Sequence, residues 1–279
     1  MATSRSVLIT GCSSGIGEAT ARRLVGSGWT VWATARRPET LESLAAAGCR
    51  TLALDVTDED SMRSAVDEAL GHGPIDALVN NAGYSQSGAV ETLTSADLRR
   101  QFETNVVGLV RMCQLVLPSM RDRRSGRIVN ISSMGAHLTF PGGGAYHASK
   151  YAVNALSDAL RFEVSGFGVK VVTVEPGLIT TSFDEAAAAS LTGLTDGPYA
   201  EFNAGVGRAT QEVYSGPMAR LGGPPEKVAK VIEKSLTVRR PKPRYTVTAS
   251  APLSMATRTV LGDRGWDLAM RTSFPRPGA

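Results

Sequence analysis

Residues 7–17 read VLITGCSSGIG, a short apolar run followed at once by a turn that holds Gly11, Gly15 and Gly17. A strand, a glycine-rich turn and a helix in this order are typical of a dinucleotide-binding element. The first glycine permits the tight turn, the second lets backbone N–H groups approach a pyrophosphate, and the third lets the helix lie close to the strand. The competing interpretation is a glycine-rich turn that holds no ligand. We expect cofactor contacts along the whole turn: Gly11, Cys12, Ser13, Ser14, Gly15, Ile16 and Gly17.

Short β-branched runs alternate with longer helical patterns along most of the chain. This alternation indicates repeated βαβ units around a parallel sheet, and continuously apolar runs fit strands that helices cover on both faces. We predict an α/β fold, a Rossmann-type doubly wound parallel sheet in a single domain, residues 1–279. The expected strands are Val7–Thr10, Thr30–Thr34, Thr51–Leu54, Ala77–Val79, Arg127–Ile131 and Val169–Val174.

Two of the expected helices carry start signals. Thr57 with Asp60, and Thr94 with Asp97, each resemble a capping box, in which two residues three apart satisfy free backbone N–H groups. The second of these helices is expected to run to about Pro118.

The pattern changes after the sixth expected strand. Residues 178–225 are rich in Gly, Ala, Ser and Thr, and such a long irregular segment in a compact α/β domain predicts a substrate lid. We then expect a helix at Glu226–Leu236 and a C-terminal extension, residues 239–279, with a further helix around Trp266–Met270. Trp266 and Met270 are expected either to roof the pocket or to pack on a neighbouring subunit. Large apolar side chains in the lid indicate either a lipophilic guest or packing of the lid onto the body: Leu178, Phe183, Leu191, Leu194, Tyr199, Phe202 and Met218.

Composition excludes several classes of function. The net charge of +4 comes without a compact run of Lys and Arg, so we expect no nucleic-acid partner. Cys12, Cys49 and Cys113 are too few and too scattered for a disulfide framework or a zinc site, as in a reducing compartment, and three dispersed histidines predict no metal. Without a signal peptide or about 18 consecutive apolar residues, we expect a soluble cytoplasmic protein with no membrane anchor.

The end of the second expected strand bears on the choice between NAD and NADP. NAD-binding sheets usually carry an acidic residue there, whereas residues 31–37 read VWATARR. Thr34 stands at the position expected for the acid, and Arg36 and Arg37 follow. Because a guanidinium group matches a phosphate with two hydrogen bonds, we predict NADP(H) rather than NAD. The alternative is that both arginines are solvated loop charges.

Tyr146 and Lys150 lie four residues apart, hence on one face of an expected helix. A phenol with a pKa of about 10 is a poor base at neutral pH, but a nearby ammonium and a positively charged nicotinamide favour the phenolate. Such a pair alone is common on protein surfaces.

The full set of motifs resembles that of the short-chain dehydrogenase/reductase family over roughly residues 4 to 237. The chain matches TGxxxGxG at residues 10–17, NNAG at residues 80–83, YxxxK at residues 146–150 and PGxxxT at residues 176–181. Ser133 lies 13 residues before Tyr146, where the family has its serine, and Asn105 lies in the long helix that holds its asparagine. Adjacent side chains of an extended segment point oppositely, so this spacing favours Ser133 over Ser132.

The resemblance implies a role for each matching residue. Ser133 would donate a hydrogen bond to the substrate oxygen, and Tyr146 would supply or remove its proton. Lys150 would hold the nicotinamide ribose and lower the pKa of the phenol, while Asn105 would hold a water that links Lys150 to solvent. Further cofactor contacts are implied at Asp55, Val56, Asn81, Ala82, Gly83, Pro176, Gly177, Ile179 and Thr181, besides Tyr146 and Lys150.

Within that family the sequence looks most like hydroxysteroid and retinol dehydrogenases, which implies a lipophilic carbonyl or secondary alcohol (steroid-, retinoid- or ketone-like) as substrate. One alternative is a catalytically idle NADP(H)-binding sensor or scaffold, although no catalytic residue is missing. Another is a lyase or epimerase of nucleotide-sugars, whose relatives usually carry GxxGxxG instead. As in relatives, the helix with small Ala152, Ala155 and Ala159, together with the long helix that contains Asn105, is expected to pair across a two-fold axis in a homodimer or homotetramer.

Overall fold

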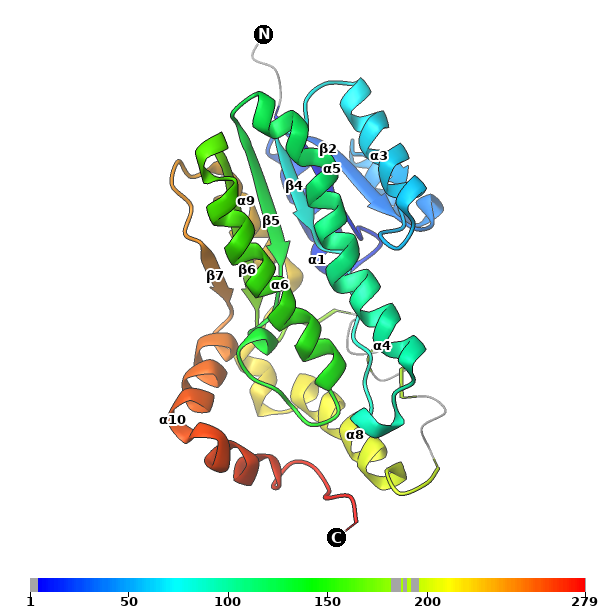
Figure 1. Cartoon of the computed structure of the whole chain (residues 1–279), viewed down its shortest axis with the longest axis vertical. Coiled ribbons are helices and arrows are strands. Elements are labelled where there is room, and N and C mark those ends of the chain that lie inside the picture. The colour runs from blue at the N-terminus through cyan, green and yellow to red at the C-terminus, as the bar shows by residue number, and fades with distance from the viewer. Residues whose placement is uncertain (1–4, 182–186, 188–189, 192–195, 279) are drawn as a thin grey trace.

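Seven parallel strands form one sheet at the centre of the computed structural model, which describes residues 5–181, 187, 190–191 and 196–278 (Figure 1). Their order across the sheet is β3-β2-β1-β4-β5-β6-β7. The bounds are β1 Ser6–Ile9, β2 Thr30–Ala35, β3 Arg50–Ala53, β4 Ala77–Asn80, β5 Gly126–Ile131, β6 Val169–Pro176 and β7 Arg244–Val247. The predicted Rossmann-type fold is confirmed, with its six expected strands shifted only slightly at their ends.

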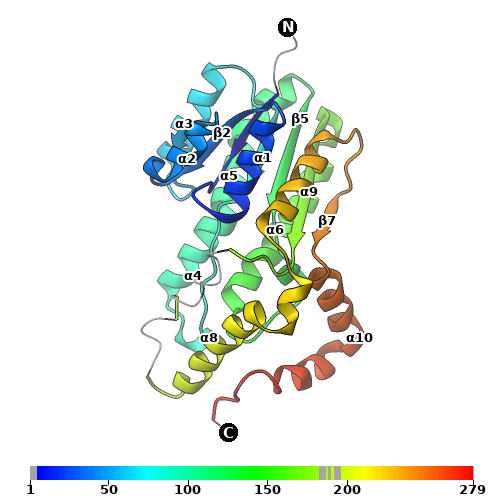
Figure 2. The same ribbon diagram turned by 180° about the vertical axis from the view of Figure 1, so that it is seen from behind.

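Helices cover both faces of the sheet (Figures 1 and 2). On one face lie α1 (Gly15–Gly26), α2 (Glu42–Ala46) and α9 (Pro225–Thr237); on the other lie α3 (Glu59–Gly71), α5 (Gly108–Asp122) and α6 (Gly144–Glu163). Strand β1 shows why the apolar runs are continuous. Val7 and Ile9 pack into the first core and Leu8 into the second, because alternate side chains leave a strand on opposite faces.

The strand order creates a crevice at the carboxyl end of β1. Strands β1 and β4 are neighbours in the sheet, although β2 and β3 separate them in the chain. Connections therefore leave these two strands in opposite directions, and a ligand site lies where they diverge. In Figure 1 this is the lower edge of the sheet, with α4 (Ser95–Phe102), α8 (Ala200–Ser215) and α10 (Ser250–Met270) beyond it.

One of the two expected capping boxes is present. Thr94 accepts a hydrogen bond from the N–H of Asp97 at 3.1 Å, and the Asp97 carboxylate accepts one from the N–H of Thr94 at 3.1 Å. The prediction for Thr57 and Asp60 is wrong, because the Thr57 hydroxyl donates to Asp55 instead (2.8 Å). Asp58 caps α3 in its place and accepts from the N–H of Ser61.

The helix expected to end near Pro118 differs from the prediction. It consists of α4 and α5, joined by a π-helical turn, Glu103–Val107, and α5 continues to Asp122. Pro118 removes one backbone donor inside α5. The helix continues past it because Val116 and Met120 are buried against the sheet.

The C-terminal third is more regular than the sequence predicts. The expected helix at Glu226–Leu236 is confirmed as α9, but the lid also contains α8. The helix expected only around Trp266–Met270 begins at Ser250 and is kinked at Gly262, whose φ is 59°. Strand β7 was not expected at all. Phe183 and Leu194 of the predicted lid lie outside the described residues.

Candidate active site

The glycine turn is fixed to the loop that follows β4. The Thr10 hydroxyl accepts hydrogen bonds from the N–H groups of Asn81 and Ala82, both at 3.0 Å. The Asn81 side-chain amide donates to the carbonyls of Thr10 (3.0 Å) and Gly11 (2.9 Å). A Cβ on Gly17 would lie 2.2 Å from the Gly11 oxygen, so only glycine lets α1 start this close to the turn. These contacts hold the start of α1 rigidly at the crevice.

A continuous cavity of about 1920 Å³ extends from the glycine turn to Tyr146 and beyond. Most of the expected cofactor-binding residues lie on its wall: Gly11, Ser13, Ser14, Gly15, Ile16, Arg36, Asp55, Val56, Asn81, Ala82, Gly83, Tyr146, Lys150, Pro176, Gly177, Ile179 and Thr181. Cys12, Gly17 and Arg37 do not line it. Cys12 is buried behind the turn with its thiol against the Ile9 carbonyl, and Arg37 is exposed.

Thr34, at the position expected to distinguish NAD from NADP, does not line the cavity. Thr34 is fully buried, and its hydroxyl donates to the Ile9 carbonyl of the neighbouring strand at 3.0 Å. Its side chain is therefore held between β1 and β2 and does not line the cavity. Ala35, the last residue of β2, and Arg36, the next residue, do line it.

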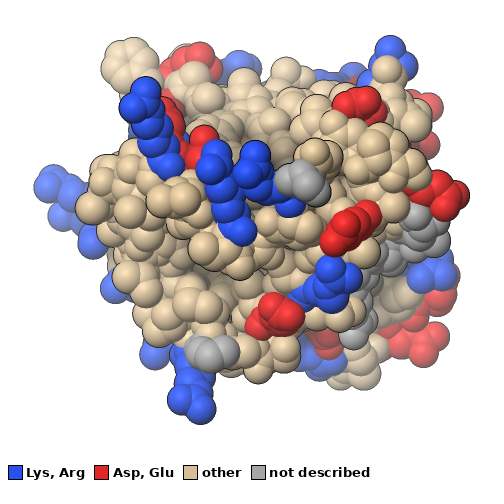
Figure 3. Space-filling view, turned by 90° about the horizontal axis from the view of Figure 1, so that it is seen from below, with Lys and Arg blue, Asp and Glu red and all other residues tan. Residues whose placement is uncertain are grey.

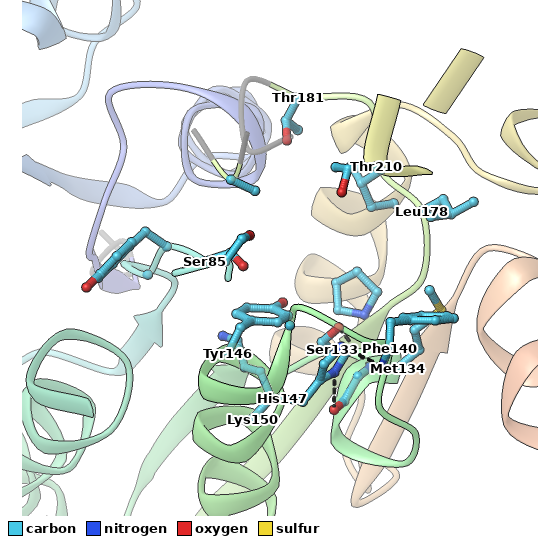
Figure 4. A pocket seen from close by; sticks show the side chains of 18 of the residues that line it. Ser85, Ser133, Met134, Phe140, Tyr146, His147, Lys150, Leu178, Thr181 and Thr210 are labelled. Atoms are coloured by element: carbon cyan, nitrogen blue, oxygen red, sulfur yellow. Dashed lines mark hydrogen bonds between the residues drawn. The ribbon is translucent and has the colours of Figure 1, made fainter. Parts of the chain in front are cut away.

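Ser133, Tyr146 and Lys150 meet at the far end of the cofactor half of the cavity (Figure 4). Ser133 follows β5, while Tyr146 and Lys150 lie one turn apart near the start of α6. Tyr146 is hydrogen-bonded to Ser133, and the Lys150 ammonium lies 5.8 Å from the centre of the Tyr146 ring. Lys150 also donates to the Ile131 carbonyl at 2.9 Å. The structure thus brings together the three side chains that the sequence singles out.

Burial shifts the pKa values of the two ionisable groups in opposite senses. It raises the pKa of Tyr146 to about 12, although the hydrogen bond with Ser133 lowers it, and it lowers the pKa of Lys150 to about 8. At neutral pH the phenol therefore keeps its proton and the lysine remains largely charged. In this state Tyr146 can donate a proton. It can accept one only as a phenolate, which additional positive charge nearby would stabilise.

Asn105 lies behind the cavity wall, in the π-helical turn. Its amide donates to the Tyr84 carbonyl (3.0 Å) and the Ser149 hydroxyl (3.1 Å), and its oxygen accepts from the Tyr84 N–H (3.1 Å). A Cβ on Gly83 would lie 3.1 Å from the Asn105 oxygen and 3.8 Å from the Lys150 nitrogen, so all three groups are close. Sequence reasoning missed Ser149, which connects Asn105 to α6 and whose position in YxxxK carries no specific signal.

The part of the cavity beyond Tyr146 holds most of its large apolar side chains, together with polar ones such as Gln86 and Thr210. The loop after β5, α8, α10 and the segment that follows α10 contribute Met134, Phe140, Val206, Trp266, Met270 and Phe274. The Trp266 indole donates to the Thr139 carbonyl at 3.0 Å, and its ring lies 5.7 Å from that of Phe140. The C-terminal extension is therefore part of the cavity wall, which was one of the two alternatives that the sequence left open.

The apolar residues expected in the lid divide between two roles. Leu178 and Met218 line the cavity. Leu191, Tyr199 and Phe202 instead form a small core with Ala89, Val206 and Phe274 that packs the lid onto the body.

Across the described ranges, no three His, Cys, Asp or Glu side chains are grouped so that they could hold a metal ion. Among the helices that the structure describes, none is both long and apolar enough to span a membrane.

A sequence model of the short chain dehydrogenase family matches residues 5–191. The chain belongs to this family. It is therefore an oxidoreductase, as the glycine turn and the Ser133–Tyr146–Lys150 group predict. The narrower likeness to hydroxysteroid and retinol dehydrogenases is not confirmed.

Three known proteins illustrate the relationship. A 3-ketodihydrosphingosine reductase of Bacteroides thetaiotaomicron is 43% identical over 67% of this chain and 69% of its own. The crystal structure of a short-chain dehydrogenase from Streptomyces avermitilis is 33% identical, with a TM-score of 0.77 over 98% of this chain and 99% of its own. The structure of ElxO with NADP bound is 25% identical, with a TM-score of 0.72 over 90% of this chain and 100% of its own.

Proposed function

We propose that this short-chain dehydrogenase is an NADP(H)-dependent enzyme that interconverts a lipophilic carbonyl compound and its secondary alcohol. The carrying observation is the hydrogen-bonded pair Ser133–Tyr146, located where the cofactor half of the cavity meets its apolar half. A substrate oxygen between these two hydroxyls would have its carbon facing the nicotinamide end of the cavity.

The protein's own residues perform the proton chemistry. The N–H of Gly135 donates to the Ser133 hydroxyl oxygen at 3.0 Å, which directs the serine proton toward Tyr146 or a substrate oxygen. Tyr146 gives its proton to that oxygen in reduction and takes it back in oxidation. Lys150 supplies positive charge that stabilises the phenolate. When bound, the nicotinamide cofactor supplies or accepts the hydride.

The walls of the cavity fit a phosphorylated dinucleotide. Gly11 and Gly15 have φ values of +72° and +60°, which glycine adopts readily, and they expose the turn's backbone to the cavity. Arg36 lies on the wall beyond the end of β2, and neighbouring Ala35 has no carboxylate to repel a phosphate. These features support NADP(H) over NAD, and ElxO, which binds NADP, has a similar fold.

The apolar half of the cavity supports a lipophilic substrate. Phe140 and Trp266 form a wide aromatic wall, although Asp97, Arg100 and Glu212 also line the cavity. A relative named for 3-ketodihydrosphingosine makes a long-chain ketone the first candidate class. The sequence resemblance adds steroids and retinoids to the candidates.

The experiment is a substrate panel read by the change in NADPH absorbance, with 2-decanone, 3-ketodihydrosphingosine, a ketosteroid and retinaldehyde. Tyr146→Phe removes only the hydroxyl, so turnover should fall by a factor of about a hundred or more while NADPH still binds. Tyr151→Phe is the matched control, because Tyr151 is an exposed tyrosine of the same helix. Wild-type turnover in Tyr146→Phe contradicts the mechanism. NADPH binding without turnover of any compound would favour the sensor or scaffold.

A further inference from the structure

His147, the residue after Tyr146, occupies a site that the proposed mechanism does not use. The residue is 6% exposed, and its ring lies between α6 and the segment we call the serine loop, residues 133–140 (Figure 4). Nδ1 of the ring lies 2.9 Å from the Gly135 carbonyl oxygen, and Nε2 lies 3.2 Å from the Phe140 backbone nitrogen. The ring therefore contacts the serine loop at two separated points.

These two partners determine where the ring carries its proton. A carbonyl oxygen can only accept a hydrogen bond, so Nδ1 must be protonated. A backbone N–H can only donate, so Nε2 must be unprotonated. The ring is thus the neutral Nδ1–H tautomer, and burial lowers the pKa of His147, which favours the same neutral form.

The ring also fills its site closely. A Cβ on Gly135 would lie 2.6 Å from His147 Nδ1, and a Cβ on Gly143 would lie 2.9 Å from its Cδ2. Gly135 is moreover the residue whose N–H donates to the Ser133 hydroxyl. Gly135 therefore contacts His147 through its carbonyl oxygen and Ser133 through its N–H group.

We propose that His147 is a positioning residue that joins the serine loop to α6 and so fixes the Ser133 hydroxyl relative to that of Tyr146. The same contact at Phe140 holds the aromatic wall of the substrate half, to which Trp266 is bonded through Thr139. Ser133 and Tyr146 lie on two different segments, and the chain joins these segments only through the residues between them. The contacts of His147 bridge the two segments and keep the two hydroxyls at a fixed position relative to each other.

The first test needs no substrate. The chain has three histidines, so ¹⁵N-histidine labelling gives few ring signals, and His147→Gln identifies the pair that belongs to His147. We expect a slowly exchanging proton on Nδ1 and an unprotonated Nε2 at neutral pH. A ring protonated on Nε2, or on both nitrogens, overturns the proposal.

The second test is kinetic and rests on the proposed oxidoreductase function. With NADPH and 2-decanone, His147→Leu should lower kcat about ten- to a hundredfold, because a small displacement of a catalytic group is costly, while NADPH binding by fluorescence stays unchanged. His147→Gln, which keeps a donor and an acceptor, should recover part of the loss. His72→Gln is the control, because His72 is exposed at the end of α3.

A variant on the loop side makes the test independent of changes at the histidine itself. Gly135→Ala should lower kcat in the same way. His147→Ala makes room for the new methyl group, so the double variant should lose less kcat than the two single variants predict together. Gly166→Ala is the control, since a Cβ there meets nothing within 4 Å. Wild-type kcat in His147→Leu or in Gly135→Ala overturns the proposal. If the wild type reduces no carbonyl compound, the proposed function fails and the tautomer measurement still decides this inference.

Discussion

At the scale of single residues, we expect Arg36 to determine the choice between NADP and NAD. Every other cofactor contact that we expect, from the glycine turn to Thr181, would meet atoms that NAD and NADP share. Losing a charge-assisted hydrogen bond to a phosphate costs about 1.5–3 kcal/mol, which corresponds to roughly ten- to a hundredfold in affinity. Arg36→Ala should therefore lower kcat/KM for NADPH by about that factor and leave kcat/KM for NADH nearly unchanged. Arg37→Ala is the matched control, because Arg37 does not line the cavity.

The complementary substitution is Ala35→Asp. It places a carboxylate on the cavity wall, where it repels a 2′-phosphate and accepts hydrogen bonds from the bare ribose, so preference should shift toward NADH. The measurement is the ratio of kcat/KM for NADPH to that for NADH. Thr34→Asp, which the sequence alone suggests, would instead bury a charge between β1 and β2 and destabilise the fold. A wild type that prefers NADH contradicts the assignment.

Lys150 gives the protein a defined pH dependence. Burial lowers its pKa to about 8, so the ammonium is lost as the pH rises through about 8. Because kcat/KM reports the free enzyme, kcat/KM for NADPH should fall across this range. The unfolded chain keeps the proton up to its ordinary pKa of about 10.4, so the buried charge disfavours folding below pH 8, and this cost diminishes as the pH rises from about 8 to 10.

Lys150→Met should accordingly abolish turnover without lowering the melting temperature. The substitution should remove the cost of burying the Lys150 charge, which the lowered pKa of this lysine puts at about 3 kcal/mol at neutral pH. Lys230→Met, at an exposed position on α9, should leave both stability and activity as they are. A large loss of stability in Lys150→Met would show that the lysine is structural.

At the scale of elements, sequence reasoning succeeds where a local pattern determines the element. The six expected strands are apolar and bounded by glycines or polar turns, and Thr94 with Asp97 caps α4 as its spacing predicts. Strand β7 has no such pattern, because it is fixed by a distant partner. Arg244 at its start bonds to the buried Glu175 of β6 at 2.7 Å, a pairing across 69 residues.

The two long helices near the apolar half of the cavity were missed or shortened for a related reason. Helix α8 contains Gly205 and Gly207, and glycine disfavours helix by about 1 kcal/mol per residue. Gly205 is nevertheless required, since a Cβ there would lie 2.5 Å from Pro275 of the C-terminal extension. Helix α10 exposes much of its length, so its apolar residues form no regular stripe.

Helix α10 is expected to act on substrate binding rather than on chemistry. Trp266 is 9% exposed, bonds to Thr139 and lies beside Phe140. Trp266→Ala should raise KM for 2-decanone, leave NADPH binding unchanged and cost about 3 kcal/mol of stability. Trp266→Phe keeps the ring and loses only the indole N–H, so its KM should lie closer to that of the wild type. Equal KM values in the wild type and Trp266→Ala would place the substrate elsewhere.

At the scale of the whole molecule, the site could be predicted from the sequence in part only. Motifs identified the glycine turn, Arg36 and the Ser133–Tyr146–Lys150 group, because each needs particular residue types at a fixed spacing. They left open whether Trp266 roofs the cavity or packs on a neighbouring subunit and did not point to Phe274, since those contacts depend on how the chain returns across the sheet edge. The face of Figure 3, seen from below, carries scattered charges of both signs on a mostly uncharged surface.

Assembly is the property that one chain determines least directly. The outer faces of α6 and the π-helical turn expose Val107 (48%), Tyr151 (45%), Leu156 (41%) and Phe162 (84%), and the small Ala155 and Ala159 lie among them on α6. Large apolar side chains beside small ones suit the close approach of a second helix, and such a cluster is unusual on a monomer. We expect α6 to pair with its copy across a two-fold axis in a homodimer or homotetramer.

Sedimentation at micromolar concentration tests this expectation. The wild type should sediment as a dimer or tetramer, and Leu156→Asp with Phe162→Asp should shift it to the monomer, because each carboxylate would be buried without a partner in the pair. Val260→Asp is the matched control, because Val260 is equally exposed (84%) but lies on α10. The cavity residues that we expect to contact the cofactor all lie on one chain, so the monomeric double variant should keep NADPH binding. A wild type that sediments strictly as a monomer refutes the pairing, and an oligomer that survives both substitutions places the interface on another face.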